Sequence, residues 1–173
     1  NEFGVALRDA LAELDITIGG RPPRFEAGRY EIYADFVNRT ASISYGKTEL
    51  VPRVRLSLDA LIKAYQREVK IVEGRKEEGK RWIEQFYTAW GNAQLKQTKQ
   101  SPRINIVDCY YELVLLRQKR NFNSAPSKRT FVDYSRAQFI YDFYEFTHRQ
   151  RLNHKGLYAA AHTATKSQAD SAS

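Results

Sequence analysis

The stretch S-R-A-Q-F-I-Y-D-F-Y-E-F-T-H-R, residues 135–149, is the segment around which the rest of the chain is organised. Ser135 offers an N-cap oxygen, and apolar residues follow it at helical spacing, which predicts a buried helix. These apolar residues are Phe139, Ile140, Phe143, Tyr144 and Phe146. Asp142 lies among them, and a carboxylate is costly to bury unless a cation or hydrogen-bond donors meet it. We therefore expect Asp142 to have a specific partner.

Length and composition indicate a single compact body with tails. The chain has 173 residues, enough for one real core and too few to make two domains the default. Cys109 is the only cysteine, so no disulfide can form within the chain. The longest apolar runs fall far short of the roughly 20 residues that cross a bilayer, and no membrane partner is expected.

The first third combines a short helix with an extended segment. Apolar residues at helical spacing predict a helix or docking arm over residues 3–14, and Gly19-Gly20 and Pro22-Pro23 then break the chain. Residues 29–36 and 41–45 alternate between apolar and polar side chains. The alternation predicts a β-hairpin, or an arm that adds strands to a neighbouring subunit.

Helical periodicity dominates the middle of the chain. Ser57 is a good N-cap for an amphipathic helix over residues 58–72, and the glycines in residues 74–79 predict a break before a second helix that ends near residue 92. Residues 104–116 are ambiguous. Their β-branched start favours a strand over residues 104–109, and the remainder favours a helix.

These patterns predict a mainly α fold with extended N- and C-terminal arms and a small β element in the N-terminal third, with α+β as the alternative. We expect residues 1–50 to form an arm or β-containing extension, residues 51–155 a helical core, and residues 156–173 a flexible tail.

Positive charge is concentrated in the last third. The net charge is +8, and residues 95–173 carry 13 basic and 6 acidic side chains. Residues 117–129 hold five cations and no acid, with Phe122 between them. Cations that meet phosphates and a ring that stacks on a base suit single-stranded nucleic acid. The alternative is an ordinary solvated loop with Phe122 in the core.

Catalytic and metal-binding patterns are missing from the sequence. The spacing of the three histidines does not match a zinc site, and no phosphate-binding glycine-rich loop is present. Cys109 lies in an apolar run and is interpreted as a small core residue. Glu31 and Asp35 are interpreted as the solvent face of a strand. We predict no enzymatic activity, no cofactor and no metal.

One family resemblance is specific in both residue type and spacing. Residues 133–149 resemble the last core helix of coat proteins from flexible filamentous plant viruses of the potyvirus family. The matching positions are Asp133-Tyr134-Ser135, Ala137, Asp142-Phe143-Tyr144-Glu145, Thr147 and Arg149. The resemblance is best over residues 111–165 and weaker over residues 51–90. The Asn-Gly-Thr-Ser-Pro signature of the family is reduced here to Ser101-Pro102.

This resemblance implies a subunit that polymerises helically around single-stranded RNA, in a virion and in the host cytoplasm during assembly. It implies an RNA groove lined by a serine, an arginine and an aspartate. The aspartate corresponds to Asp142, the serine to Ser101, and the arginine to Arg117 or Arg120. The basic loop adds Lys128 and Arg129 as expected phosphate contacts.

A carboxylate cannot attract phosphate, so we expect Asp142 to hold an arginine fork in place while the arginine faces the RNA backbone. The function predicted from the sequence is therefore a capsid subunit that binds RNA without sequence specificity. The alternative is a non-viral RNA- or DNA-binding accessory subunit of a larger complex.

Overall fold

The computed structural model describes residues 2–99 and 101–162 of the chain. It divides into two compact units rather than the single body expected from the length. The first unit comprises Asn1–Arg75 with Arg136–Gln138, and the second comprises Lys76–Ser135 with Phe139–Ser173.

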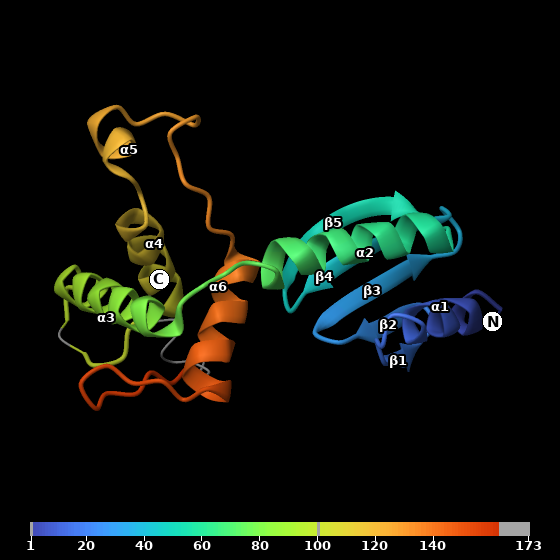
Figure 1. The fold of residues 1–173 in the computed structure, drawn as a ribbon, viewed down its shortest axis with the longest axis horizontal. Helices are drawn as coiled ribbons and strands as arrows, with labels where there is room; N and C mark the ends of the chain where they lie inside the picture. The colour runs from blue at the N-terminus through green and yellow to red at the C-terminus, as the bar shows by residue number, and fades with distance from the viewer. Residues whose placement is uncertain (1, 100, 163–173) are drawn as a thin grey trace. The chain divides into compact units, whose positions relative to one another are not determined.

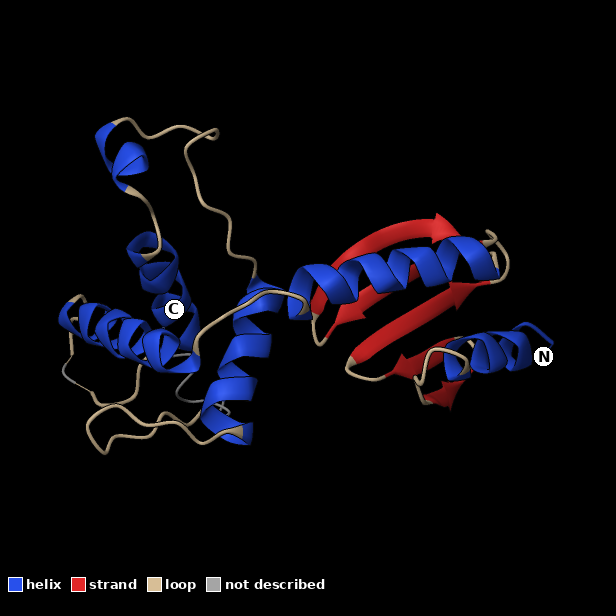
Figure 2. Ribbon diagram, in the orientation of Figure 1, coloured by secondary structure: helices blue, strands red, loops and turns tan. Residues whose placement is uncertain are grey.

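The first unit is built on a five-stranded antiparallel sheet whose strands follow one another in sequence order (Figures 1 and 2). The strands are β1 (Ile18–Arg21), β2 (Arg24–Ala27), β3 (Tyr30–Asp35), β4 (Thr40–Tyr45) and β5 (Thr48–Arg55). The predicted hairpin is confirmed as β3 and β4, which pair with Tyr30 opposite Tyr45 and Ala34 opposite Ala41. Because side chains alternate along a strand, these four residues share one buried face.

Two helices cover that buried face. α1 (Glu2–Ala12) confirms the predicted N-terminal helix, and its Gly4 lies against the ring of Phe25 on β2. α2 (Leu58–Glu73) begins at the predicted cap, where Ser57 Oγ accepts from the backbone N–H of Ala60 at 3.4 Å. The Tyr65 hydroxyl of α2 donates to the carbonyl of Ala27 at 3.3 Å. The first unit therefore has two layers, with helices on one face of the sheet.

Sequence reasoning missed the hairpin of β1 and β2. Gly20 has a φ of 79°, and a side chain there would lie 2.7 Å from the carbonyl oxygen of Arg24 on the paired strand. Only glycine fits this close approach. Pro22-Pro23 occupy the turn between Arg21 and Arg24, which face each other in the register. The glycines and prolines therefore shape a hairpin where we expected a chain break.

The expectation of a mainly α fold is wrong. The sheet uses five strands over residues 18–55, so β structure is a principal layer of the first unit and the fold is α+β. Strand β5 runs across the boundary expected between residues 50 and 51, and the first unit continues through α2 to Arg75.

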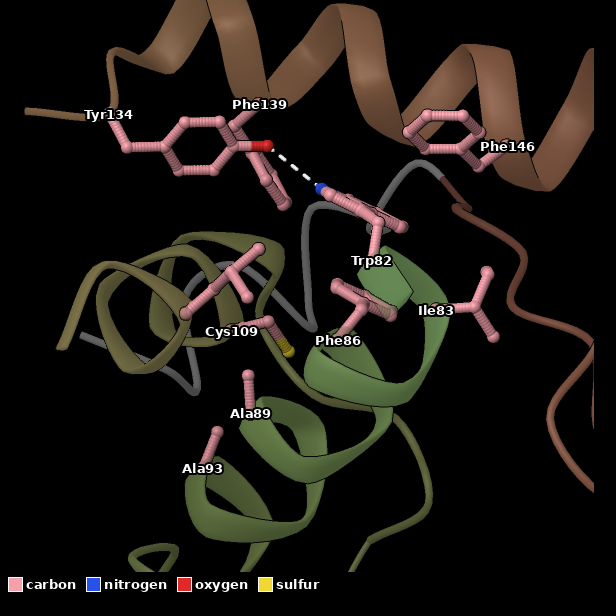
Figure 3. Close-up of a cluster of buried hydrophobic side chains, with 10 residues drawn as sticks. Trp82, Ile83, Phe86, Ala89, Ala93, Cys109, Tyr134, Phe139 and Phe146 are labelled. Carbon is pink, nitrogen blue, oxygen red and sulfur yellow. Dashed lines mark hydrogen bonds between the residues drawn. The ribbon is translucent and has the colours of Figure 1, made fainter. Parts of the chain in front are cut away.

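The second unit is helical. Its elements are α3 (Gly79–Leu95), α4 (Ile106–Leu116), the short α5 (Arg120–Ser124), α6 (Arg136–Phe143) and the π-helix η1 (Tyr144–Arg149). The last two confirm the helix predicted over residues 135–149. Figure 3 shows the core of this unit, where side chains from α3, α4, α6 and η1 meet. Cys109 is 2% exposed in it, which confirms its interpretation as a core residue.

The strand expected over residues 104–109 is wrong. α4 begins at Ile106, and Asn105 caps it, because its Oδ1 accepts from the backbone N–H of Val107 at 2.9 Å. An N-cap that follows Pro102 outweighs the β preference of three branched residues.

None of the described helices is long and apolar enough to cross a membrane. Of the tail expected over residues 156–173, residues 163–173 lie outside the described part of the chain.

Candidate nucleic-acid interface

Asp142 is the most deeply buried acid that the structure describes, at 1% exposure. The hydroxyl of Tyr134 donates to its Oδ2 at 2.6 Å. The same hydroxyl accepts from the indole N–H of Trp82 at 2.9 Å, drawn in Figure 3. Burial, with the neighbouring charge of Asp142, raises the pKa of Tyr134 well above its ordinary value, so the phenol stays a donor. Two consecutive hydrogen bonds thus link Asp142 through Tyr134 to Trp82 in the aromatic core.

Arg117 lies on the other side of the Tyr134 ring. It is the C-cap residue of α4, and its guanidinium carbon is 4.2 Å from the centroid of that ring. Its Nη2 donates to Oε2 of Glu77 at 2.6 Å. Both side chains are mostly covered, at 18% exposure for the arginine and 15% for the glutamate. Arg117 is therefore held flat between an aromatic face and a carboxylate.

Arg117 stays protonated in this position. Burial alone would lower its pKa, but the hydrogen bond and charge of Glu77, helped by Tyr134 and Asp142, raise the pKa above its ordinary value. Its Nη1 is shielded from solvent and has no hydrogen-bond partner.

Asp142 and Arg117 have hydrogen-bond partners other than each other. We expected Asp142 to grip an arginine by a two-pronged hydrogen bond. Instead Asp142 accepts from Tyr134, and the side-chain hydrogen bond of Arg117 goes to Glu77. Asp142 acts on Arg117 through the tyrosine between them and through its charge.

The other predicted cations lie on the segment that follows Arg117. Arg120 begins α5, and Lys128 and Arg129 lie on the loop that returns to α6, where all three are exposed. Figure 1 shows α5 beyond the end of α4, with this loop leading back from it. Ser127 and Thr130 bond each other across the turn, with Ser127 Oγ and Thr130 Oγ1 3.1 Å apart. These bonds hold the turn whose two central residues are Lys128 and Arg129.

Phe122 is not in the core, which was the alternative considered from the sequence. Its ring is half-buried and meets the ring of Phe131 edge-on, with centroids 5.5 Å apart. It packs the basic segment against the stretch that follows it and is not among the core side chains of the second unit.

Ser101 is separated from the other predicted residues. It lies before α4, where its Oγ accepts from the backbone N–H of Arg103 at 3.1 Å. Arg117 follows the last residue of the same helix, and eleven helical residues span roughly 16 Å. The structure therefore groups Arg117 with Asp142 and places Ser101 at the opposite end of α4.

Three residues of this site were missed from the sequence. Glu77 lies among other charged residues and carries no distinguishing signal, and Tyr134 enters the sequence argument only through the family motif. Gln118 is 8% exposed, and its side chain bonds both the N–H and the carbonyl of Val132, at 2.8 and 2.9 Å. An amide that pairs with a distant backbone segment leaves no periodic signal in the sequence.

Charge is divided unequally between the two units. The second unit carries 15 basic and 9 acidic residues and the first 13 and 11, so their net charges are +6 and +2, which together make +8. No group of three or more histidine, cysteine or acidic side chains suited to a metal ion occurs among the described residues.

Comparisons of the chain with protein-family models, with curated proteins and with solved structures found no match.

Proposed function

We propose that the protein is a non-enzymatic capsid subunit that binds single-stranded RNA through its second unit and polymerises helically. The observation that carries the proposal is the basic segment, residues 117–129, in which four exposed cations follow the covered Arg117 along the chain. No acid interrupts this segment. A local excess of positive charge attracts phosphates more strongly than the same charge spread over the surface.

The chemistry of the segment favours RNA binding without sequence preference. Its cations are lysines and arginines on a helix and a turn, which suit contacts to phosphate oxygens. Such contacts fix the position of a strand and carry no base information. A protein that coats a whole genome requires this kind of contact.

Self-association is supported by the outer face of α4. This face is defined here as Val107, Tyr111 and Leu115, spaced four residues apart and 39%, 50% and 55% exposed. Monomeric proteins rarely display a contiguous stripe of large apolar side chains, and such stripes typically mark contacts with other molecules. The resemblance of residues 111–165 to filamentous coat proteins points the same way.

The RNA-binding part is tested by two matched double variants. K128A/R129A removes two cations from the basic segment, and R53A/R55A removes two exposed cations from strand β5 of the first unit. Binding of a 20-nucleotide oligouridylate is measured against salt concentration. Because each phosphate contact to a single strand contributes roughly 0.7 to the salt slope, K128A/R129A should reduce the slope by about 1.4.

R53A/R55A should leave the slope close to that of the unaltered protein. Equal losses from the two variants would mean that only net charge matters and would remove the assigned interface.

Electron microscopy and sedimentation of the protein with RNA test assembly. Particles that stop at one small size would instead indicate a nucleic-acid-binding accessory subunit.

A further inference from the structure

The two terminal nitrogens of Arg117 are in different states. Nη2 is occupied by Glu77 at 2.6 Å, whereas Nη1 is shielded from solvent without a hydrogen-bond partner. A phosphate binds an arginine most strongly through two parallel hydrogen bonds, which requires two guanidinium nitrogens. A phosphate therefore cannot form the full fork with these terminal nitrogens while Glu77 is in place.

Glu77 belongs to the segment that joins the two units. Residues 74–78 connect α2 to α3, and the division between the units falls between Arg75 and Lys76. Gly79, the first residue of α3, packs closely against other parts of the second unit. A side chain at this position would lie 2.6 Å from Leu152 and 2.8 Å from Phe146. The start of α3 is thus packed into the second unit, while the ion pair with Arg117 holds Glu77 just before it.

We infer that Glu77 is an internal competitor for RNA phosphate: its carboxylate occupies Arg117 in the free subunit, and a backbone phosphate displaces it on binding. This inference rests on the proposed function and adds a regulation of the same site. Carboxylate and phosphate oxygens accept the same hydrogen bonds from a guanidinium, so the exchange keeps the arginine charge paired.

The exchange couples RNA binding to the connecting segment. When phosphate takes Arg117, Glu77 loses its hydrogen bond to this arginine, which is one of the contacts that hold residues 75–78. By linkage, RNA binding weakens the hold on residues 75–78, and weakening that hold by other means tightens RNA binding.

Glu77→Gln tests the competition, with Glu78→Gln as the matched control. Both variants remove one negative charge at neighbouring positions, but Glu78 is exposed and makes no cap hydrogen bond from its side chain. Removing the competitor should tighten binding of the 20-nucleotide oligouridylate by about tenfold, equivalent to about 1.4 kcal/mol. Glu78→Gln should tighten it less than about twofold, because a single exposed charge is largely screened. Equal effects of the two variants would overturn the inference.

Trypsin cleavage after Lys76 gives a second readout that needs no variant. Lys76 is exposed, and cleavage there follows the opening of the connecting segment. RNA should speed this cleavage several-fold in the unaltered protein. Slower or unchanged cleavage in the RNA complex would contradict the exchange.

These outcomes separate the two proposals. If the unaltered protein fails to bind the oligouridylate, the proposed function fails. If it binds, yet Glu77→Gln and Glu78→Gln behave alike and cleavage after Lys76 is insensitive to RNA, the function stands and the competitor role of Glu77 is wrong.

Discussion

Tyr134 joins the polar and apolar parts of the second unit. Its hydroxyl links Trp82 to Asp142, its ring supports Arg117, and its carbonyl accepts from the Tyr110 hydroxyl at 2.7 Å. Tyr134 thus contacts both the buried Asp142 and Arg117 and fixes their positions relative to each other. An acid in an aromatic core is tolerated because a phenol that stays protonated reaches it.

Removing the hydroxyl of Tyr134 should therefore lower the free energy of unfolding, because this one group takes part in two buried hydrogen bonds. Tyr134→Phe takes a hydrogen-bond partner from both Trp82 and Asp142 in a buried setting, at an expected cost of about 1–3 kcal/mol in the free energy of unfolding. Tyr158→Phe serves as the control, because Tyr158 is 62% exposed and should change stability by less than about 0.5 kcal/mol. Urea denaturation followed by tryptophan fluorescence measures both. Equal stability of the two variants would contradict this account of Asp142.

Sequence reasoning at the residue scale found the charged members of the site and missed what connects them. Asp142 stood out because an acid among aromatics demands an explanation, and Arg117 came from the family resemblance. The bond from Arg117 to Glu77 joins residues 40 positions apart. Such pairings depend on the packing of whole helices, which residue types alone do not determine.

At the scale of elements, strong periodicity predicted well. α2 has its cap and apolar face where the sequence placed them, and β3 and β4 pair as the alternation predicted. The errors came at glycines and prolines. Gly19-Gly20 and Pro22-Pro23 looked like chain breaks, but they shape the β1–β2 hairpin, because a close backbone approach and a tight turn need these residues.

The apolar outer face of α4 yields an element-scale prediction. Leu115→Gln should leave folding nearly unchanged, because the side chain is 55% exposed, yet it should raise the protein concentration needed for assembly by about tenfold or more. The control is Leu95→Gln at the end of α3, which is 86% exposed and off the stripe. Light scattering with RNA measures assembly. Unchanged assembly of Leu115→Gln would remove α4 from the subunit contact.

At the scale of the whole molecule, composition predicted an uneven distribution of charge, and the structure divides the chain so that most of the excess lies in the second unit. The division itself was not predicted. A chain of 173 residues is short for two cores, and the break predicted in residues 74–79 was expected to separate two helices of one body. Which helices share a core is decided by long-range packing, for which local periodicity carries no signal.

Two units with separate cores should respond separately to core substitutions. Both tryptophans and Cys109 belong to the second unit, so tryptophan fluorescence and thiol labelling report on that unit. Burial raises the pKa of the Cys109 thiol to about 11, so it should react only after the second unit opens.

Ile43→Ala empties a fully buried position on strand β4 and should destabilise the first unit by about 2–4 kcal/mol. The loss should appear in far-ultraviolet circular dichroism, while the fluorescence midpoint in urea and the thiol labelling rate stay unchanged. Leu113→Ala, equally buried on α4, should shift both probes of the second unit. A fluorescence midpoint lowered as much by Ile43→Ala as by Leu113→Ala would show that the units unfold as one cooperative body.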